Sequence, residues 1–129
     1  VYPLALKEIK RGRKRSHWMW YIFPQFKGLG FSPTSIKYAI NSKQEAIDFF
    51  NDGVLGKNLL EITNAFLSIE HQSALDILGK SDVVKMKSCM TLFDAIQNDT
   101  AVFNDVLDKY FNGNKCSKTI KYLEEYSIV

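Results

Sequence analysis

The sequence predicts an all-α fold, a compact single-domain bundle of six or seven short helices with an irregular aromatic loop at about residues 18–31. Apolar residues recur three or four positions apart along most of the chain, as they do on one face of a helix. Serine or threonine precedes several of these stretches, where it can act as an N-cap, and glycine follows others. The alternation with a period of two that marks β-strands is absent.

In the N-terminal half, spacing and caps predict the helices. Residues 2–11 have apolar side chains at helical spacing and end at Gly12. Ser32-Pro33 supplies an N-cap and a first helical position for a short helix through residue 39. Ser42 and Glu45 have the spacing of a capping box, and an apolar face follows over residues 56–69.

In the C-terminal half, a short helix is expected over residues 73–79, a longer one from 81 to 96, and another from 100 to 112. A final turn or two is expected around residues 120–123. The core is predicted to contain Phe66, Met90, Phe93, Val106 and Leu107. Between the first two predicted helices, Pro24, Gly28 and Gly30 prevent a long helix, so we expect a short helix or turn and then a loop.

Composition limits the classes of function. The chain has 129 residues, of which 46% are apolar and 24% charged, as in a folded domain. No apolar stretch is long enough to span a bilayer and no signal peptide is recognised, so we expect a cytoplasmic protein that binds no membrane. Cys89 and Cys116 form no C-x-x-C pair, and no Cys/His cluster has zinc spacing, so we expect reduced thiols and no metal.

Positive charge is concentrated near the N-terminus. Residues 1–30 carry seven Lys or Arg and one acid, Glu8, whereas the remainder carries a net negative charge. All three arginines lie within residues 11–15, together with Lys14. Such a cluster favours an anionic ligand or nucleic acid, although a solvated surface or an intramolecular partner for the acidic remainder explains it equally well.

The segment His17-Trp18-Met19-Trp20 follows this basic cluster directly and places several chemically useful groups together. A tryptophan beside Arg13, Lys14 or Arg15 suits stacking on a planar ring whose phosphate the cation holds. Because Trp18 and Trp20 are two positions apart, they point in different directions, and one is expected in the core while the other lines a cleft. His17 is the candidate general acid–base, with a packing or capping histidine as the alternative.

Four further side chains are candidates for ligand binding. Gln25 is suited to a base edge or a carboxylate, or else to fixing the loop backbone. Ser88 and Thr91 are three apart and share a helix face beside Lys87, an arrangement suited to an anion or sugar. Back-bonding of these hydroxyls to their own helix is the competing interpretation. Gly28-Leu29-Gly30 lacks the third glycine of a dinucleotide fingerprint, and we predict no cofactor.

Six short motifs resemble one family. They are HWMW at 17–20, FPQ at 23–25, GLG at 28–30, YAI at 38–40, VLG at 54–56 and SCMTLF at 88–93. Together they resemble a bacterial and fungal family of small, mainly helical proteins with no assigned activity, often labelled calpastatin. The resemblance implies a helical fold and, because family members begin earlier, a chain that lacks part of its N-terminal helix. The calpastatin label conflicts with this sequence, because calpain-inhibitory segments are disordered until bound and carry a Pro-Pro motif that is absent here.

The sequence names no reaction and leaves open whether the protein is an enzyme. The favoured hypothesis is a domain that binds a small anionic or nucleotide-like molecule in a pocket lined by the HWMW and FPQ segments. The alternatives are a nucleic-acid-binding module that uses Lys10–Arg15 and a protein-interaction domain that uses the aromatic segment. If the first hypothesis holds, His17, Trp20, Gln25 and Ser88 should surround one cavity.

Overall fold

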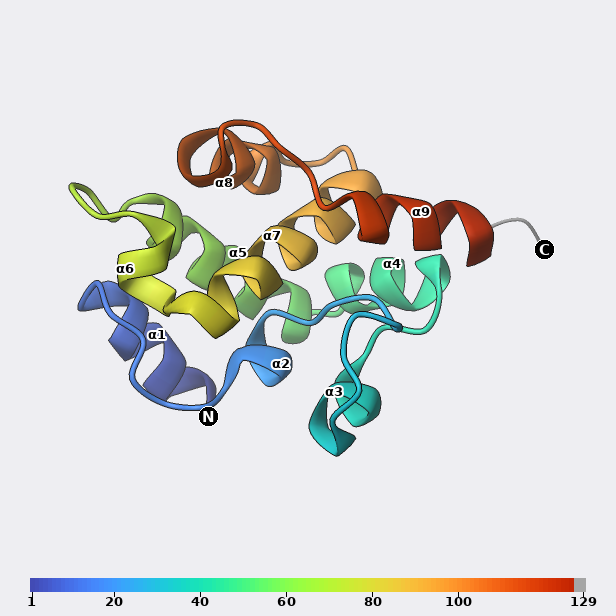
Figure 1. Ribbon diagram of the computed structural model, residues 1–129, viewed down its shortest axis with the longest axis horizontal. Helices are drawn as coiled ribbons and strands as arrows, with labels where there is room; N and C mark the ends of the chain where they lie inside the picture. The colour runs from blue at the N-terminus through green and yellow to red at the C-terminus, as the bar shows by residue number, and fades with distance from the viewer. Residues whose placement is uncertain (127–129) are drawn as a thin grey trace.

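The fold is built from helices, and the structure, a computed structural model, describes residues 1–126 (Figure 1). The described residues contain nine helices and one isolated bridge, with no strand. The helices are α1 (Tyr2–Lys10), α2 (Met19–Ile22), α3 (Pro33–Tyr38), α4 (Lys43–Asn51), α5 (Leu55–Leu67), α6 (Ala74–Leu78), α7 (Lys80–Ala95), α8 (Val102–Phe111) and α9 (Ser117–Tyr126). The all-α prediction is confirmed, but six or seven helices was too few. Helix α2 is a single turn without a side-chain cap, and it lies in the aromatic segment where a short helix or turn was expected.

Serine hydroxyls begin three of the helices. Ser32, Ser42 and Ser73 each accept a hydrogen bond from the backbone N–H three residues later, at 3.0–3.1 Å. These N-caps satisfy donors that have no partner within the helix. The reciprocal half of the predicted Ser42 capping box is absent, because the Glu45 carboxylate accepts from the N–H of Asn41 instead. The complete capping box lies at Ser73, where Asp76 supplies the second hydrogen bond.

The core lies around α5 and α7, which occupy the middle of the molecule (Figure 1). Helix α7 packs against α4, α6, α8 and α9, and α5 packs against α1, α4 and α8. All five predicted core residues are completely buried, which confirms the helix phases from which they were chosen. Residues 88–93 are buried without interruption, so this part of α7 is enclosed on every side and carries Ser88 and Thr91 into the interior. Within residues 1–126, none of the helices is both long and apolar enough for a membrane span.

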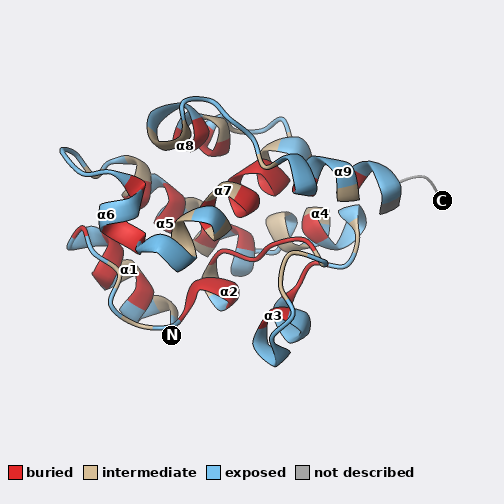
Figure 2. Ribbon diagram, in the orientation of Figure 1, coloured by how far each residue is buried: buried red, intermediate tan, exposed pale blue. Residues whose placement is uncertain are grey.

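The loop after α2 is attached at two places. Its backbone pairs with Ile40, which donates to the Gln25 carbonyl and accepts from the Lys27 N–H. Its turn at Gly28 has a φ of +91°, and a Cβ there would lie 3.1 Å from the Tyr122 ring of α9. These contacts keep residues 23–26 in the interior, as the burial colours show (Figure 2). They also bring Gln25 close to the start of α9.

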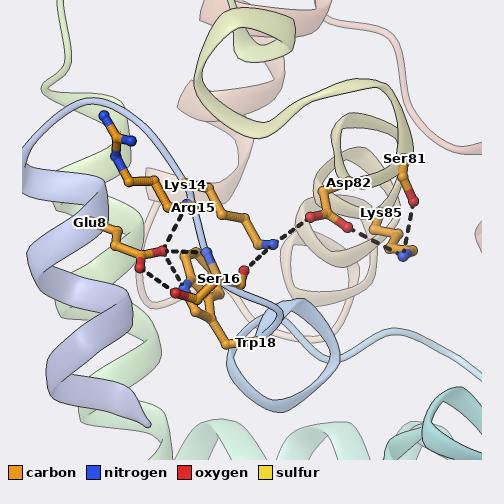
Figure 3. A network of polar contacts seen from close by, with 8 residues as sticks. All are labelled: Glu8, Lys14, Arg15, Ser16, Trp18, Ser81, Asp82 and Lys85. Carbon is orange, nitrogen blue, oxygen red and sulfur yellow. Dashed lines mark hydrogen bonds and ion pairs between the residues drawn. The ribbon is translucent and has the colours of Figure 1, made fainter.

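Glu8 on α1 connects the first helix to the basic segment (Figure 3). Its carboxylate accepts four hydrogen bonds: from the backbone N–H groups of Arg15 and Ser16 at 2.9 and 3.0 Å, the Ser16 hydroxyl at 2.6 Å, and Trp18 Nε1 at 2.8 Å. Burial alone would raise the pKa of Glu8, but these donors outweigh it and lower the pKa from 4.5 to about 2. The one acid of the basic N-terminal stretch is therefore a structural anchor.

We expect the Glu8→Gln variant to be less stable than the native chain at neutral pH, because the amide is uncharged and has one acceptor oxygen where the carboxylate has two. Since folding lowers the Glu8 pKa, the carboxylate contributes stability above pH 4.5, and this contribution is lost as the pH falls toward 2. The difference in free energy of unfolding between the two proteins should therefore shrink over that range. Denaturant titrations at several pH values measure it.

A second variant shows whether the hydrogen bonds themselves matter. Glu8→Ala leaves the buried Trp18 donor without an acceptor, which costs about 1–3 kcal/mol beyond the effect of losing the charge. A Glu8→Ala protein as stable as Glu8→Gln would contradict the anchoring role of this carboxylate.

Candidate functional site

Two pockets contain most of the side chains selected from the sequence. The first, here called the small pocket, has a volume of about 160 Å³. It is lined by Lys14, His17, Met19, Trp20, Tyr21, Thr34, Asp82 and Lys85. The second, here called the α7–α9 pocket, has a volume of about 390 Å³. It is lined by Gln25, Leu29, Val84, Lys85, Lys87, Ser88, Lys115, Cys116, Ser117 and Lys118.

The four residues expected to surround one cavity are thus divided. His17 and Trp20 line the small pocket, whereas Gln25 and Ser88 line the α7–α9 pocket. Lys85 contributes to both linings. The division arises because the chain turns at Phe23 and Pro24, so that the HWMW and FPQ segments lead to different places.

In the small pocket, the cations are already paired (Figure 3). Lys14 Nζ lies 2.6 Å from Asp82 and donates to the Ser16 carbonyl at 2.5 Å. Asp82 also pairs with Lys85 at 3.2 Å. Asp82 neutralises much of this positive charge. Lys14 therefore attaches the basic segment to α7 and is poorly suited to bind an anionic ligand.

The two tryptophans have different environments. Trp18 is 1% exposed, packs in the core against Phe23, and has Lys14 Nζ 4.9 Å from its ring centroid. Trp20 is 8% exposed and lines the small pocket. A Cβ on Gly30 would lie 2.9 Å from the Trp20 ring, so the loop backbone covers that side of it. His17 is exposed at the pocket rim, and nothing in the described residues pairs with it.

The α7–α9 pocket lies where the start of α9 meets the side of α7. Cys116 precedes α9 in the N-cap position, because its carbonyl accepts from the Ile120 N–H at 3.2 Å. Its own N–H donates to the Thr91 hydroxyl on α7 at 2.9 Å. The first N–H groups of α9 lack partners within the helix, and the helix dipole makes this end positive.

Ser88 and Thr91 have distinct roles in this joint. Thr91 is buried and donates back to the Lys87 carbonyl at 2.8 Å, the back-bonding interpretation considered above. It therefore supports the pocket from behind. The Ser88 hydroxyl lies 3.1 Å from the Val84 carbonyl and 3.3 Å from Cys116 Sγ. Since it has one hydrogen, it donates either to its own helix or to the sulfur.

Cys116 is half-buried, and its surroundings favour the thiolate. Burial alone would raise the pKa of this thiol, but the Ser88 hydroxyl and the Thr119 and Lys118 N–H groups at the start of α9 outweigh it, and the pKa is lowered. The Thr119 hydroxyl acts in the same direction. Because it makes no conventional hydrogen bond among the described residues, its effect on the sulfur is weaker than that of Ser88. In contrast, Cys89 is fully buried, and burial raises the pKa of its thiol.

Gln25 contributes an unsatisfied polar group. Its side chain is 2% exposed and lines the α7–α9 pocket, and its amide nitrogen has no hydrogen-bond partner among the described residues. A buried donor without an acceptor costs about 1–3 kcal/mol. In native proteins such a group is usually paired with protein, water or a bound ligand, and this amide is therefore suited to a ligand that supplies an acceptor.

The arginines lie away from both pockets. Arg11, Arg13 and Arg15 are exposed, and none forms an ion pair within residues 1–126. The Arg15 guanidinium points away from Glu8, which binds only its backbone (Figure 3). Arg13 borders a shallow hollow beside Asp76 and Gly79. Their availability leaves the nucleic-acid hypothesis open.

Sequence analysis missed the α9 side of the site, namely Lys115, Cys116 and Lys118. Their signal was a cysteine just before a helix and between two lysines, an environment that lowers a thiol pKa. That signal was hidden because α9 was expected to be only a turn or two near residue 120. Within the described residues, no group of three or more His, Cys, Asp or Glu side chains could hold a metal ion.

Comparison with known proteins identifies the family. The family described as "Protein of unknown function (DUF1810)" matches residues 1–123. The chain belongs to this family. The DUF1810 match confirms the resemblance inferred from the short motifs, and it brings no assigned activity.

A solved structure is similar to the chain over nearly its whole length. It is the crystal structure of the conserved hypothetical protein Rv1873 from Mycobacterium tuberculosis, at 37% sequence identity and a TM-score of 0.94. The match covers 96% of this chain and 89% of the mycobacterial one. A comparison with curated proteins gave no match. The chain thus shares its fold with a solved structure, and neither comparison assigns a function.

We predict that Cys116 reacts with the neutral reagent iodoacetamide faster than Cys89, because only Cys116 is both accessible and favoured as a thiolate. The rate at Cys116 should rise with pH through a midpoint below the ordinary thiol value of 9.0. A charged sulfur is a stronger acceptor than the Val84 carbonyl, so we expect the Ser88 hydroxyl to donate to the thiolate, and Ser88→Ala should move that midpoint upward. Mass spectrometry of the two cysteine peptides measures both rates, and a midpoint unchanged by Ser88→Ala would contradict the assigned geometry.

Proposed function

We propose that this protein binds a small organic anion in the α7–α9 pocket. The observation that carries the proposal is the convergence of four lysines, the start of α9 and the unsatisfied amide of Gln25 on one pocket whose lining contains no acid. Each of these features favours a negatively charged or hydrogen-bond-accepting ligand. Together these features define the charge and hydrogen-bonding properties of a ligand better than the exposed arginines do.

The charges at this pocket are only partly neutralised. Lys85 pairs with Asp82 at 3.2 Å, and Lys115 pairs with Asp94 at 3.7 Å. Lys87 and Lys118 form no ion pair within the described residues. These two lysines, with the positive end of α9, therefore provide the net attraction for an anion.

Size and polarity separate the α7–α9 pocket from the others. Its volume of about 390 Å³ lies within the usual range of ligand sites, roughly 300–1,000 Å³, whereas that of the small pocket does not. Two hollows have a comparable volume, one of about 380 Å³ beside Arg11 and one of about 440 Å³ beside Arg13. Each includes an acid in its lining, Glu70 or Asp76, and neither contains, among the described residues, a buried group without a partner. Leu29 and Val84 add apolar surface to the α7–α9 pocket. This combination supports an anion whose charge the lysines attract, and Leu29 and Val84 can also contact the carbon atoms of a phosphorylated or carboxylated metabolite.

The HWMW segment was expected to line a ligand pocket and to stack a planar ring, but its surroundings support a mainly structural role for its two tryptophans. Trp18 is a core anchor and Trp20 is nearly covered, so neither offers an open face for stacking a nucleotide base. We retain His17 as a candidate acid–base only for chemistry in the small pocket. We further propose a cytoplasmic location, supported by two free cysteines of which one is partly accessible.

The second candidate is nucleic-acid binding by the exposed residues of Lys10–Arg15. Its support is that Arg11, Arg13 and Arg15 are unpaired among the described residues. Binding of this kind weakens steeply with salt, because each phosphate contact releases counterions. It would also be insensitive to changes in the α7–α9 pocket.

We predict that pyrophosphate, sugar phosphates or di- and tricarboxylates raise the melting temperature at constant ionic strength. A ligand at 100 times its dissociation constant adds about 2.7 kcal/mol of stability, which corresponds to several degrees. The double variant Lys87→Gln/Lys118→Gln should lose most of this stabilisation. The matched control, Lys7→Gln/Lys57→Gln, removes the same charge from exposed positions on α1 and α5 and should retain it.

A third variant shows which part of the protein is responsible when anions raise the melting temperature. The variant Arg11→Gln/Arg13→Gln/Arg15→Gln removes more charge but leaves the α7–α9 pocket intact. Stabilisation that survives the lysine changes and disappears with the arginine changes would contradict the proposal and favour the basic cluster.

A further inference from the structure

Cys116 is held in the α7–α9 pocket by its backbone. The N–H bond to Thr91 and the carbonyl bond to Ile120 fix the residue on two sides, at 2.9 and 3.2 Å. The sulfur therefore stays beside Ser88, at 3.3 Å from its hydroxyl, and at the positive end of α9. This is a fixed position for a nucleophile in a pocket that a small molecule can enter.

The groups around the sulfur are hydroxyls, N–H groups and lysines. Helix α7 supplies Lys85, Lys87 and Ser88, and the chain at the start of α9 supplies Lys115 and Lys118. The loop after α2 contributes neutral Gln25, and Asp82 and Asp94 pair with two of these lysines, Lys85 and Lys115. Such surroundings stabilise a thiolate, the form of cysteine that attacks electrophiles.

We propose that Cys116 is a thiol-exchange site that forms a mixed disulfide with small anionic disulfides bound in the α7–α9 pocket. This inference rests on the anion-binding function proposed above. The Cys116 thiolate attacks one sulfur of the bound disulfide, a new S–S bond forms, and the original S–S bond breaks. The other half leaves as a thiolate, so the electrons balance without a further oxidant.

The unsatisfied Gln25 amide independently indicates a ligand at this place. It is buried, lines the same pocket and lacks an acceptor among the described residues. A carboxylate on the disulfide can accept from this amide while other carboxylates interact with Lys87 and Lys118. The site thus favours disulfides that carry several carboxylates.

Cys89 cannot release the product. It is completely buried in α7, out of reach of the bound molecule. The mixed disulfide at Cys116 therefore persists until an external thiol attacks it. This makes Cys116 a reversible modification site whose state follows the ratio of small thiol to disulfide.

The test compares three disulfides of different charge on the whole protein. They are oxidised glutathione, which is anionic, bis(2-hydroxyethyl) disulfide, which is neutral, and cystamine, which is cationic. Each rate of adduct formation is measured by intact mass and peptide mapping, and divided by the rate of the same disulfide with a small uncharged thiol. We expect the anionic reagent to exceed the cationic one by about tenfold or more at low salt, with the ratio falling as salt is added.

Variants assign the effect to the pocket. Lys87→Gln/Lys118→Gln should reduce the preference for the anionic reagent several-fold, whereas Lys7→Gln/Lys57→Gln should retain it. Cys116→Ser should abolish the adduct. Equal normalised rates for the three reagents, an adduct on Cys89, or a preference unchanged by Lys87→Gln/Lys118→Gln would overturn the inference.

Pyrophosphate cannot react with a thiol, so its stabilising effect on the native protein measures anion binding alone. If pyrophosphate binds and the anionic disulfide has no advantage, the exchange inference fails while the proposed function stands. If neither effect is seen, both fail.

Discussion

The carboxylate of Glu8 attaches the basic segment to α1, and the path of the chain toward both pockets follows from that attachment. By accepting from Arg15, Ser16 and Trp18, it draws the strongly cationic stretch back along the first helix. The Trp18 ring then enters the core, and Lys14 reaches Asp82 on α7. The position of one buried acid thereby determines which cations make contacts within the fold. Lys14 makes such contacts, whereas the arginine side chains remain exposed.

A second joint, between Thr91 and Cys116, builds the α7–α9 pocket. Thr91 is buried in the enclosed part of α7, and its hydroxyl holds the residue that begins α9. The positive end of α9 is thus placed beside Lys87 and Ser88, although it is far from them in the sequence. The site combines a helix end, partly neutralised lysines and a thiol, and this combination supports anion binding and thiol exchange at a single place.

Much of the fold was predictable because its signals are local. Serine caps at residues 32, 42 and 73 and the apolar spacing around Phe93 depend on neighbours a few positions away. The site was only half predictable. Lys87, Ser88 and Gln25 were selected, but Cys116 was not, because its contact with Ser88 spans 28 positions and depends on how α9 meets α7. Likewise, the sequence showed that Trp18 and Trp20 should differ, but the choice of Trp18 for the core depends on its bond to Glu8, which had been considered only as a charge.

We propose above that an anion is bound by the start of α9 and the Gln25 amide. An NMR titration of the ¹⁵N-labelled protein with pyrophosphate, at constant ionic strength, tests it most directly. Binding in the α7–α9 pocket should cause saturable shifts of the Gln25 side-chain NH₂ and of the backbone N–H signals of Ser117, Lys118 and Thr119, with one common dissociation constant. Shifts confined to residues 10–15, or no saturable shift at these four residues, would contradict it.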